Sequence, residues 1–319
     1  MPSIPNVRCE ESRAATDGIL KSVERVIFGK DRPIRFALCS LVAGGHILIE
    51  DRPGVGKTTM ARALAASLGC SFKRIQFTPD LLPADITGVS IFNQKDREFE
   101  FRSGPVFTNI LLADEINRTT PKTQSSLLEA MDEFQVTVDG VSYALPRPFF
   151  VIATQNNIEF HGTYPLPEAE MDRFLMRIEM GYPTRQEEIQ VLASQMDHHP
   201  LRDVSPVLKP DEIRALQVES RRIHIHNDLQ QYIVDVVTAT RHHPAVRIGS
   251  SPRGSIGLLH ASRAWALLDG RDYCIPDDVK ILAVPVLAHR VILNGGPQSV
   301  SDRAVIEDVL SGIPVPVLD

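Results

Sequence analysis

The chain has 319 residues, long enough for two domains, and its apolar content of 43% is that of a protein with a sizeable core. Its 34 basic and 40 acidic residues give a net charge of −6, which disfavours nucleic-acid binding because that function usually needs a basic surface. The polar N-terminus predicts no signal peptide, and no apolar run approaches the roughly 18 residues of a membrane span. With four scattered cysteines, these features favour a reduced, cytoplasmic protein.

The first half of the chain alternates helices and strands. Apolar spacing predicts helices at residues 14–26, 34–43, 57–68 and 122–131. Short apolar runs predict buried strands at residues 46–50 and 149–153, and further strands are expected at residues 72–77, 109–114 and 174–179. Two β-rich runs around Asp139-Gly140 predict a hairpin at about residues 134–146. Strands that alternate with helices favour an α/β fold with a parallel sheet between helices.

After Tyr182 the pattern is that of helices alone. They are expected at residues 186–196, 210–220, 227–242, 252–268 and 276–289, and no strand is predicted there. We therefore expect two domains, an α/β domain with N-terminal helices at residues 1–182 and a small all-helical domain at residues 183–319.

A phosphate-binding loop of the Walker A type is indicated by Pro53-Gly54-Val55-Gly56-Lys57-Thr58, with Thr59 next to it. The glycines let backbone N–H groups turn toward phosphate oxygens, Lys57 reaches the β- and γ-phosphates, and the Thr58 hydroxyl is offered to Mg²⁺. Asp51 stands where the full pattern has its first glycine. The alternative is a Gly/Pro turn before a helix, but the buried strand before the loop and the amphipathic helix after it disfavour that interpretation.

Asp114 and Glu115 end an apolar strand, which is the pattern of a Walker B motif. The carboxyl ends of parallel strands face the ligand crevice, so we expect Asp114 to hold the Mg²⁺ shell and Glu115 to activate the attacking water. For these two residues alone, an N-cap of the next helix is an equally good interpretation. The phosphate loop upstream favours the catalytic one, and the two motifs together predict ATP hydrolysis.

Further motifs resemble those of a known family, the MoxR family of AAA+ ATPases. The resemblance extends from about residue 28 to residue 288, and the run from Gly162 to Ala169 is long and specific. The motifs are Gly44-Gly45-His46-Ile47-Leu48-Ile49-Glu50, the phosphate loop, Asp114-Glu115-Ile116-Asn117-Arg118, Ala153-Thr154-Gln155-Asn156, Gly162-Thr163-Tyr164-Pro165-Leu166-Pro167-Glu168-Ala169 and Met171-Asp172-Arg173-Phe174. The implied fold is an AAA+ P-loop NTPase domain followed by a helical lid domain.

The resemblance also implies roles for four polar residues. Asn156 is expected to be the first sensor, which orients water against the γ-phosphate. Arg173 is expected to be an arginine finger that enters the site of a neighbouring subunit, although a surface salt bridge is the ordinary role of such a residue. Arg253 is expected to be the second sensor, reaching phosphate from the lid, and Arg118 is expected near the subunit junction.

An assembly and a biological role follow from the same resemblance. We expect a homo-oligomeric ring, most simply a hexamer, that uses ATP and Mg²⁺ for chaperone-like remodelling of a client protein. The work implied is maturation or metal-cofactor insertion of that partner, together with a von Willebrand factor A domain protein. A second hairpin insertion is implied within residues 88–107, and the two hairpins are equally well interpreted as partner contacts or as ordinary surface structure.

Two departures from the family pattern bear on these roles. Asn157 stands where a proline is expected after the first sensor. Gly254 follows Arg253 where a helix-favouring residue is usual, at a cost of roughly 1 kcal/mol in helix propensity.

Two other functions compete with the remodelling ATPase. A nucleic-acid remodeller is disfavoured because the hairpin at residues 135–145 carries Asp139 and no lysine or arginine. A nucleotide-dependent scaffold that does not hydrolyse ATP is disfavoured by the intact Glu115.

Overall fold

The computed structural model describes residues 9–156, 163–195, 200–295 and 300–317, and within these ranges five strands form one parallel sheet. The strands are β1 (Ile47–Glu50), β2 (Phe72–Gln76), β5 (Ile110–Asp114), β8 (Phe150–Gln155) and β9 (Met176–Ile178). Their order across the sheet is β2, β5, β8, β1, β9. The predicted α/β class with a parallel sheet between helices is therefore confirmed.

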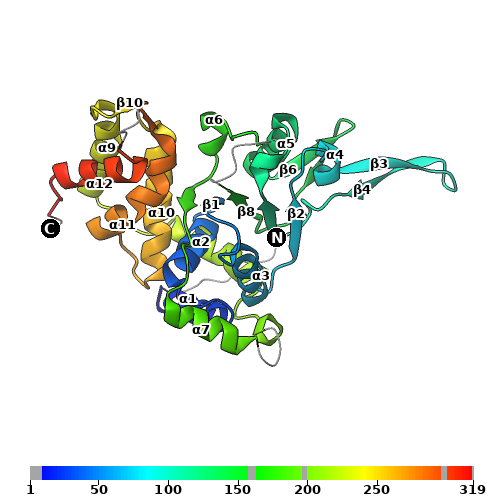
Figure 1. Ribbon diagram of the computed structural model, residues 1–319, viewed down its shortest axis with the longest axis horizontal. Helices are drawn as coiled ribbons and strands as arrows, with labels where there is room; N and C mark the ends of the chain where they lie inside the picture. Colours follow the sequence, from blue (N-terminus) through cyan, green and yellow to red (C-terminus); the bar gives the residue numbers. More distant parts are fainter. Residues whose placement is uncertain (1–8, 157–162, 196–199, 296–299, 318–319) are drawn as a thin grey trace.

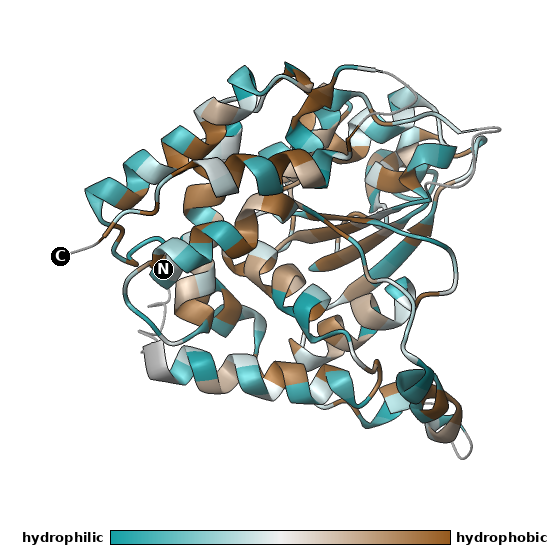
Figure 2. Ribbon diagram, turned by 60° about the vertical axis from the view of Figure 1, so that its left-hand side comes forward, coloured by the Kyte–Doolittle hydropathy of each residue, from teal (hydrophilic) through white to brown (hydrophobic). Residues whose placement is uncertain are grey.

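The strands β1, β5 and β8 each contribute to two separate apolar clusters, one on either face of the sheet. In β1, Ile47 and Ile49 belong to one cluster and Leu48 to the other, because successive side chains of a strand point to opposite faces. Figure 2 shows these apolar strands enclosed between helices. The first cluster includes side chains of α1 (Cys9–Glu24), α2 (Asp31–Val42) and α3 (Lys57–Ser67), and the second those of α4 (Pro83–Thr87) and α5 (Pro121–Glu133).

The chain after β9 is mainly helical, as expected, and its later helices stand beside the sheet domain (Figure 1). Its helices are α7 (Arg185–Ser194), η2 (Pro200–Asp203), α8 (Pro210–Ser220), α9 (Asn227–His242), α10 (Pro252–Leu268), α11 (Pro276–Leu287), η3 (Ala288–Arg290) and α12 (Asp302–Gly312). No helix in the described ranges is both long enough and apolar enough to cross a bilayer.

This region also contains strands, so the prediction that it holds none was wrong. The strands β10 (Val246–Ile248) and β11 (Ile292–Leu293) pair antiparallel, although more than forty residues of chain separate them. Strands of two or three residues are too short to show a periodic pattern, and their pairing is a long-range contact that local sequence does not reveal. The helix α12 was also not predicted.

The two expected hairpins are present. One pairs β3 (Gly88–Asn93) with β4 (Glu98–Ser103), and the other pairs β6 (Gln135–Val138) with β7 (Val141–Ala144). The β3–β4 hairpin extends far from the body of the molecule (Figure 1). Gly88 and Gly104 form its narrow base, since a Cβ on Gly104 would lie 2.2 Å from the carbonyl oxygen of Ile86.

The helices on both sides of Tyr182 share one apolar cluster. In that cluster α10 packs against α1 and α2, and α8 packs against α2. A division into residues 1–182 and 183–319 remains a prediction, but the helices of the second part complete the core on one face of the sheet.

One buried polar residue holds a strand end and a helix end together. The His46 ring lies among Phe134, Phe149 and Phe150, with centroid separations of 5.9, 5.7 and 6.4 Å. Its Nδ1 accepts a hydrogen bond from the N–H of Val151 at 3.0 Å, which leaves Nε2 to donate to the carbonyl of Met131 at 3.1 Å. Burial lowers the pKa of His46 to about 4 from its usual 6.5.

This buried imidazole predicts an acid-dependent loss of stability. Between pH 6.5 and about 4 the unfolded chain binds a proton at His46 that the folded chain does not, so the free energy of unfolding falls as pH falls, by up to roughly 3 kcal/mol. Above pH 6.5 this contribution is constant. Urea unfolding at pH 7 and pH 5 measures the effect, and His46→Asn should weaken the pH dependence. If the free energy of unfolding of His46→Asn differs between pH 7 and pH 5 by as much as that of the wild type, the assignment to His46 is contradicted.

Candidate nucleotide-binding site

The loop between β1 and α3 owes its shape to two glycines. Gly54 and Gly56 have φ angles of +82° and +95°, in the left-handed region that other residues disfavour. A Cβ on Gly56 would also lie 3.0 Å from Cδ1 of Ile27. Gly56 is the N-cap of α3, so the loop leads directly into the unpaired N–H groups and the positive end of that helix. Such a helix end favours an anion.

A cavity of about 360 Å³ lies at the carboxyl ends of β1, β5 and β8. It is lined by Pro53, Gly54, Gly56, Lys57, Thr58, Thr59, Arg74, Asp114, Glu115 and Asn156. All of these except Arg74 belong to the site expected from the sequence. Val55, which was also expected there, buries its side chain in the core and has only its backbone available to a ligand.

Asp51 connects the loop to the chain that leaves the sheet. Its carboxylate accepts hydrogen bonds from the N–H groups of Met180 and Gly181, at 2.7 and 2.6 Å, and from that of Arg52 at 2.7 Å. Its φ angle is not positive, so the position does not need a glycine. The departure from the usual loop pattern therefore supplies a link between the loop and the segment that enters the helical region.

Lys57 points back across the loop. Its Nζ donates to the carbonyl of Asp51 at 2.6 Å. Partial burial lowers the pKa of Lys57, and the nearby charges of Asp51, Asp114 and Glu115 oppose that shift. The ammonium group thus lies near the carboxylates and beside the helix end, a position suited to phosphate oxygens.

Asp114 is a buried carboxylate with its oxygens already engaged. Oδ1 accepts from Thr154 Oγ1 at 2.6 Å, and Oδ2 accepts from Nε and Nη2 of Arg74 at 3.0 and 2.7 Å. The Thr58 hydroxyl lines the same cavity. A hydroxyl and a carboxylate are the oxygen ligands that Mg²⁺ prefers, so this pair fits the metal, with Arg74 sharing the carboxylate.

Glu115 has an unusual backbone conformation at the mouth of the cavity. Its φ angle is +57°, which is rare for a residue with a side chain and is concentrated at functional sites. Its N–H donates to Thr154 Oγ1 at 2.9 Å. Its Oε2 accepts from Gln76 Nε2 at 2.8 Å and lies 3.0 Å from Nε of Arg118. The carboxylate is therefore held by side chains from two different segments, and the backbone by a third.

Sequence reasoning missed Arg74, Gln76 and Thr154. The β2 strand was predicted, but only its register shows that Gln76 lies opposite Asp114 and that Arg74 reaches the same carboxylate. Thr154 was part of a quoted motif, without a role. A polar residue two or fewer positions from the end of a parallel strand is the signal that could have identified all three.

The two predicted arginines at more distant positions do not line this cavity in the described part of the chain. Arg173 donates to the carbonyl of Leu128 at 3.1 Å and pairs with Asp132 at 2.5 Å. Arg253 is exposed on the first turn of α10, where its N–H donates to Ser251 Oγ at 3.2 Å. The expected roles of Arg173 as arginine finger and of Arg253 as second sensor remain predictions. Asn157, the departure noted after the first sensor, lies outside the described residues.

Close packing explains the glycine beside Arg253. A Cβ on Gly254 would lie 2.1 Å from Ser250 Oγ and 3.1 Å from Cδ2 of Leu287. Ser250 is buried, and its N–H donates a hydrogen bond to Thr240 Oγ1 at 3.0 Å, which holds the residue in place. Gly254 therefore allows the first turn of α10, which carries Arg253, to pack against the preceding segment.

This packing predicts that the helix-favouring substitution is harmful. Gly254→Ala should gain about 1 kcal/mol in helix propensity, yet lower the melting temperature because the added methyl group meets Ser250. Thermal melts of Gly254→Ala, Ser250→Ala and the double variant measure the coupling. We expect Gly254→Ala to be better tolerated in the Ser250→Ala background. Additive effects of the two substitutions contradict the packing explanation.

The fold and the site together define the AAA+ class of P-loop NTPases. The defining features are the parallel sheet, the glycine loop that leads into α3, the two acids at the end of β5 and the helical region that follows. Comparison with known proteins agrees. Residues 46–176 match the "ATPase family associated with various cellular activities (AAA)", and residues 238–309 match the "AAA lid domain".

Individual relatives specify the family further. The protein YeaC of Bacillus subtilis (strain 168) is 52% identical over 93% of this chain and 94% of its own length. The chaperone MoxR1 of Mycobacterium tuberculosis is 42% identical over 92% of this chain and 80% of its own length. A crystal structure from Cytophaga hutchinsonii, described as that of a candidate ATPase, has a TM-score of 0.90 at 38% identity and covers 97% of both chains. The chain belongs to the MoxR family of AAA+ ATPases.

Proposed function

We propose that this protein hydrolyses ATP in a Mg²⁺-dependent reaction and uses the energy to remodel a client protein. The observation that carries the proposal is the cavity in which a helix N-terminus, Lys57 and the carboxylates of Asp114 and Glu115 come together. Cationic and N–H groups on one side suit the triphosphate, and acids on the other suit a metal and a water molecule.

Each lining residue has a distinct part in this proposal. The backbone N–H groups of residues 54–58 and the Lys57 ammonium bind and orient the phosphates. Thr58 and Asp114 hold Mg²⁺, which when bound neutralises phosphate charge. Glu115 accepts a proton from the attacking water, and Asn156, buried at the end of β8, helps to position that water.

A ring is the natural setting for this site. Arg173 is tied to α5 in its own chain and lies outside its own cavity, which supports a role as finger in a neighbouring subunit. We propose a homo-oligomer of six subunits in the cytoplasm, in which Arg253 brings the lid to the phosphates of its own subunit.

Turnover by matched variants tests hydrolysis. Glu115→Gln should lower kcat by at least about 100-fold while nucleotide still binds, since a general base contributes roughly that much. Lys57→Ala should weaken binding itself. Phosphate release and binding of a fluorescent ATP analogue measure the two effects, with exposed Glu129→Gln and Lys122→Ala as controls. A wild-type protein that binds ATP without releasing phosphate contradicts the proposal and favours a nucleotide-dependent scaffold.

The relative MoxR1 is named a chaperone, which supports client remodelling as the work of the ATPase. We propose that the client is a protein undergoing maturation or metal-cofactor insertion, assisted by a partner with a von Willebrand factor A domain. Remodelling needs a surface that grips unfolded or partly folded protein, and apolar exposed side chains provide one.

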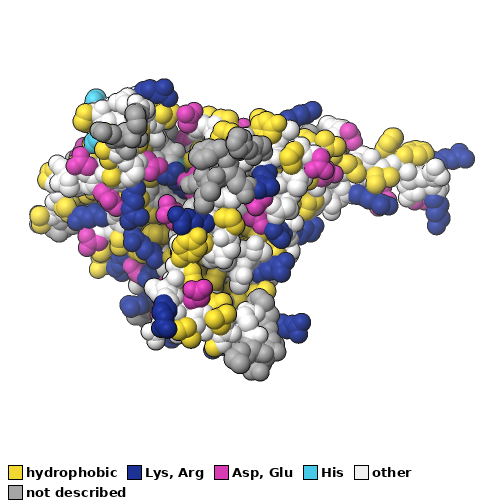
Figure 3. Space-filling model, viewed as in Figure 1, with side chains coloured by type: hydrophobic (Ala, Val, Ile, Leu, Met, Phe, Trp, Pro, Cys, Tyr) yellow, Lys and Arg dark blue, Asp and Glu magenta, His cyan; other side chains and the backbone are white. Residues whose placement is uncertain are grey.

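The two hairpins form such a surface. A groove of about 400 Å³ between them is lined by Ser90, Phe99, Phe101, Val138, Asp139, Val141 and Tyr143. Phe101 stacks on Tyr143 at a centroid distance of 4.0 Å, which joins the two hairpins, and Phe99 is 75% exposed. Figure 3 shows apolar side chains along the projecting hairpin. We propose that the client binds there.

Capture of clients by trap variants tests this surface. Proteins retained by Glu115→Gln with ATP can be identified by mass spectrometry, and Phe99→Ser in the same background should reduce their recovery at least about fivefold, as loss of a central aromatic contact does. Val234→Ser on α9, where the side chain is 52% exposed, is the matched control. Equal recovery from the Phe99→Ser and Val234→Ser proteins contradicts a role for the hairpins.

A further inference from the structure

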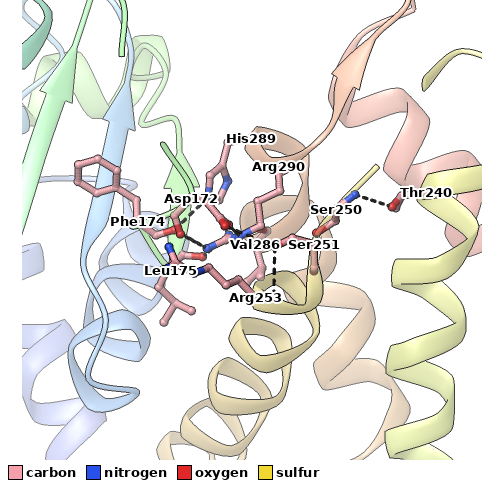
Figure 4. Close-up of polar contacts among 10 residues, drawn as sticks. All are labelled: Asp172, Phe174, Leu175, Thr240, Ser250, Ser251, Arg253, Val286, His289 and Arg290. Atoms are coloured by element: carbon pink, nitrogen blue, oxygen red, sulfur yellow. Dashed lines mark hydrogen bonds and ion pairs between the residues drawn. The ribbon is translucent and has the colours of Figure 1, made fainter. Parts of the chain in front are cut away.

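A polar cluster built around the buried Arg290 joins the segment around Arg173 to the lid. It consists of Asp172, Ser251 and Arg290, which we call the Asp172 latch (Figure 4). Asp172 follows α6 (Glu168–Met171) and directly precedes Arg173. Its carboxylate accepts from Arg290 Nε at 2.7 Å and from Ser251 Oγ at 3.4 Å.

Arg290 is almost completely enclosed, with only 4% of its side chain exposed. Besides the carboxylate, Arg290 donates to the carbonyls of Asp172 at 3.1 Å, Phe174 at 2.7 Å and Leu175 at 3.1 Å. It also donates to the carbonyl of Val286 in α11. A single lid guanidinium therefore fixes the backbone on both sides of Arg173.

Apolar packing holds the same segment against α10. A Cβ on Gly257 would lie 3.3 Å from Cδ1 of Leu175, so the glycine lets the helix approach closely. Leu175 in turn donates its N–H to the carbonyl of His46 at 2.8 Å, just before β1. The segment is thus enclosed between the sheet and the helix that begins with Ser251 and carries Arg253.

Arg173 itself leaves this enclosed segment in another direction. Its guanidinium contacts α5, at Leu128 and Asp132, and is not one of the three members of the latch. Its backbone is held by the lid while its side chain is presented elsewhere. If η3 and the first turn of α10 move, the backbone at residues 172–175 must move with them. Otherwise the buried guanidinium of Arg290 would lose its hydrogen-bond partners, and an unpaired buried charge is costly.

We propose that the Asp172 latch makes the position of Arg173 depend on the lid of its own subunit. This inference rests on the proposed roles of Arg173 and Arg253 and deepens them. Nucleotide bound in one subunit changes its lid through Arg253, the latch carries the change to Arg173, and Arg173 acts at the neighbouring site. Asp172 and Arg290 are positioning residues, and their effect is a coupling between adjacent active sites.

A second ion pair across the same boundary provides a matched control. Arg177 in β9 pairs with Glu50 at 3.1 Å and with Asp302 at the start of α12. This bridge also connects the sheet to the lid, but its members are Glu50, Arg177 and Asp302 and none of them belongs to residues 172–175. Asp172→Asn and Asp302→Asn each remove one carboxylate charge from such a bridge, so a general loss of stability should be shared by both.

Hydrogen exchange measures the coupling without requiring turnover. On addition of AMP-PNP and Mg²⁺, the backbone amides of residues 172–176 should change their exchange rate in the wild type and in Asp302→Asn. In Asp172→Asn that change should be lost, while the amides of residues 54–68 still report nucleotide binding. Arg290→Lys, which keeps the charge but loses the forked contacts, is the second variant if Asp172→Asn does not fold.

Turnover then tests the link to Arg173. Asp172→Asn should lower kcat by at least about fivefold and bring the Hill coefficient for ATP toward one, with the Kd for ATP changed less than twofold. In an Arg173→Ala background it should have no additional effect, because the latch acts through that residue. Asp172→Glu should restore part of the rate.

The outcomes separate this inference from the proposed function. Exchange coupling in a wild type that releases no phosphate refutes hydrolysis and leaves the latch supported. An unchanged exchange response in Asp172→Asn, no response at residues 172–176 in the wild type, or an additive effect with Arg173→Ala overturns the latch while hydrolysis stands. Absence of AMP-PNP binding overturns both.

Discussion

The parallel pairing of β5 with its neighbours is the constraint on which the whole site depends. Ala113 pairs with Ala153 in β8, and Asp114 pairs with Gln76 in β2. On the other side of β8, Glu50 pairs with Gln155, so the loop after β1 begins level with the end of β8. A shift of one residue in β5 would move Asp114 to the opposite face and remove a carboxylate from the cavity.

Local sequence predicted those parts of the fold that carry their own signals. The helices α8, α9 and α10 begin at Pro210, Asn227 and Pro252 as expected, and a proline marks the starts of α8 and α10. The phosphate loop and the strand-end acids were likewise found from their patterns. These features require only a short stretch of chain to recognise.

Contacts between distant segments were beyond the same reasoning. Arg74 and Gln76 reach Asp114 and Glu115 only once β2 is paired with β5. Asp51 departs from the loop pattern because it bonds the chain after β9, about 130 residues later. Arg290 gave no signal at all, since its partners Asp172 and Phe174 lie more than 110 residues earlier. Each of these is a polar or charged side chain that acts across the fold.

Taken together, these long-range contacts tie the nucleotide loop and the Arg173 segment to the region that forms the lid. Asp51 holds the segment that enters the helical region, and Arg290 holds the segment that enters β9. Buried or half-buried charged bonds of this kind resist gradual distortion, because partial separation leaves an unpaired charge. They suit a protein whose parts move as units.

The account stands on the claim that the cavity at the strand ends holds a triphosphate. A crystal structure with AMP-PNP and Mg²⁺ tests it directly. We predict β- and γ-phosphate oxygens within about 3 Å of the N–H groups of residues 54–58 and of Lys57 Nζ, with the metal beside Thr58 and Asp114. Nucleotide bound elsewhere, for example in the groove of about 290 Å³ between α2, β9, α11 and α12, would contradict the claim.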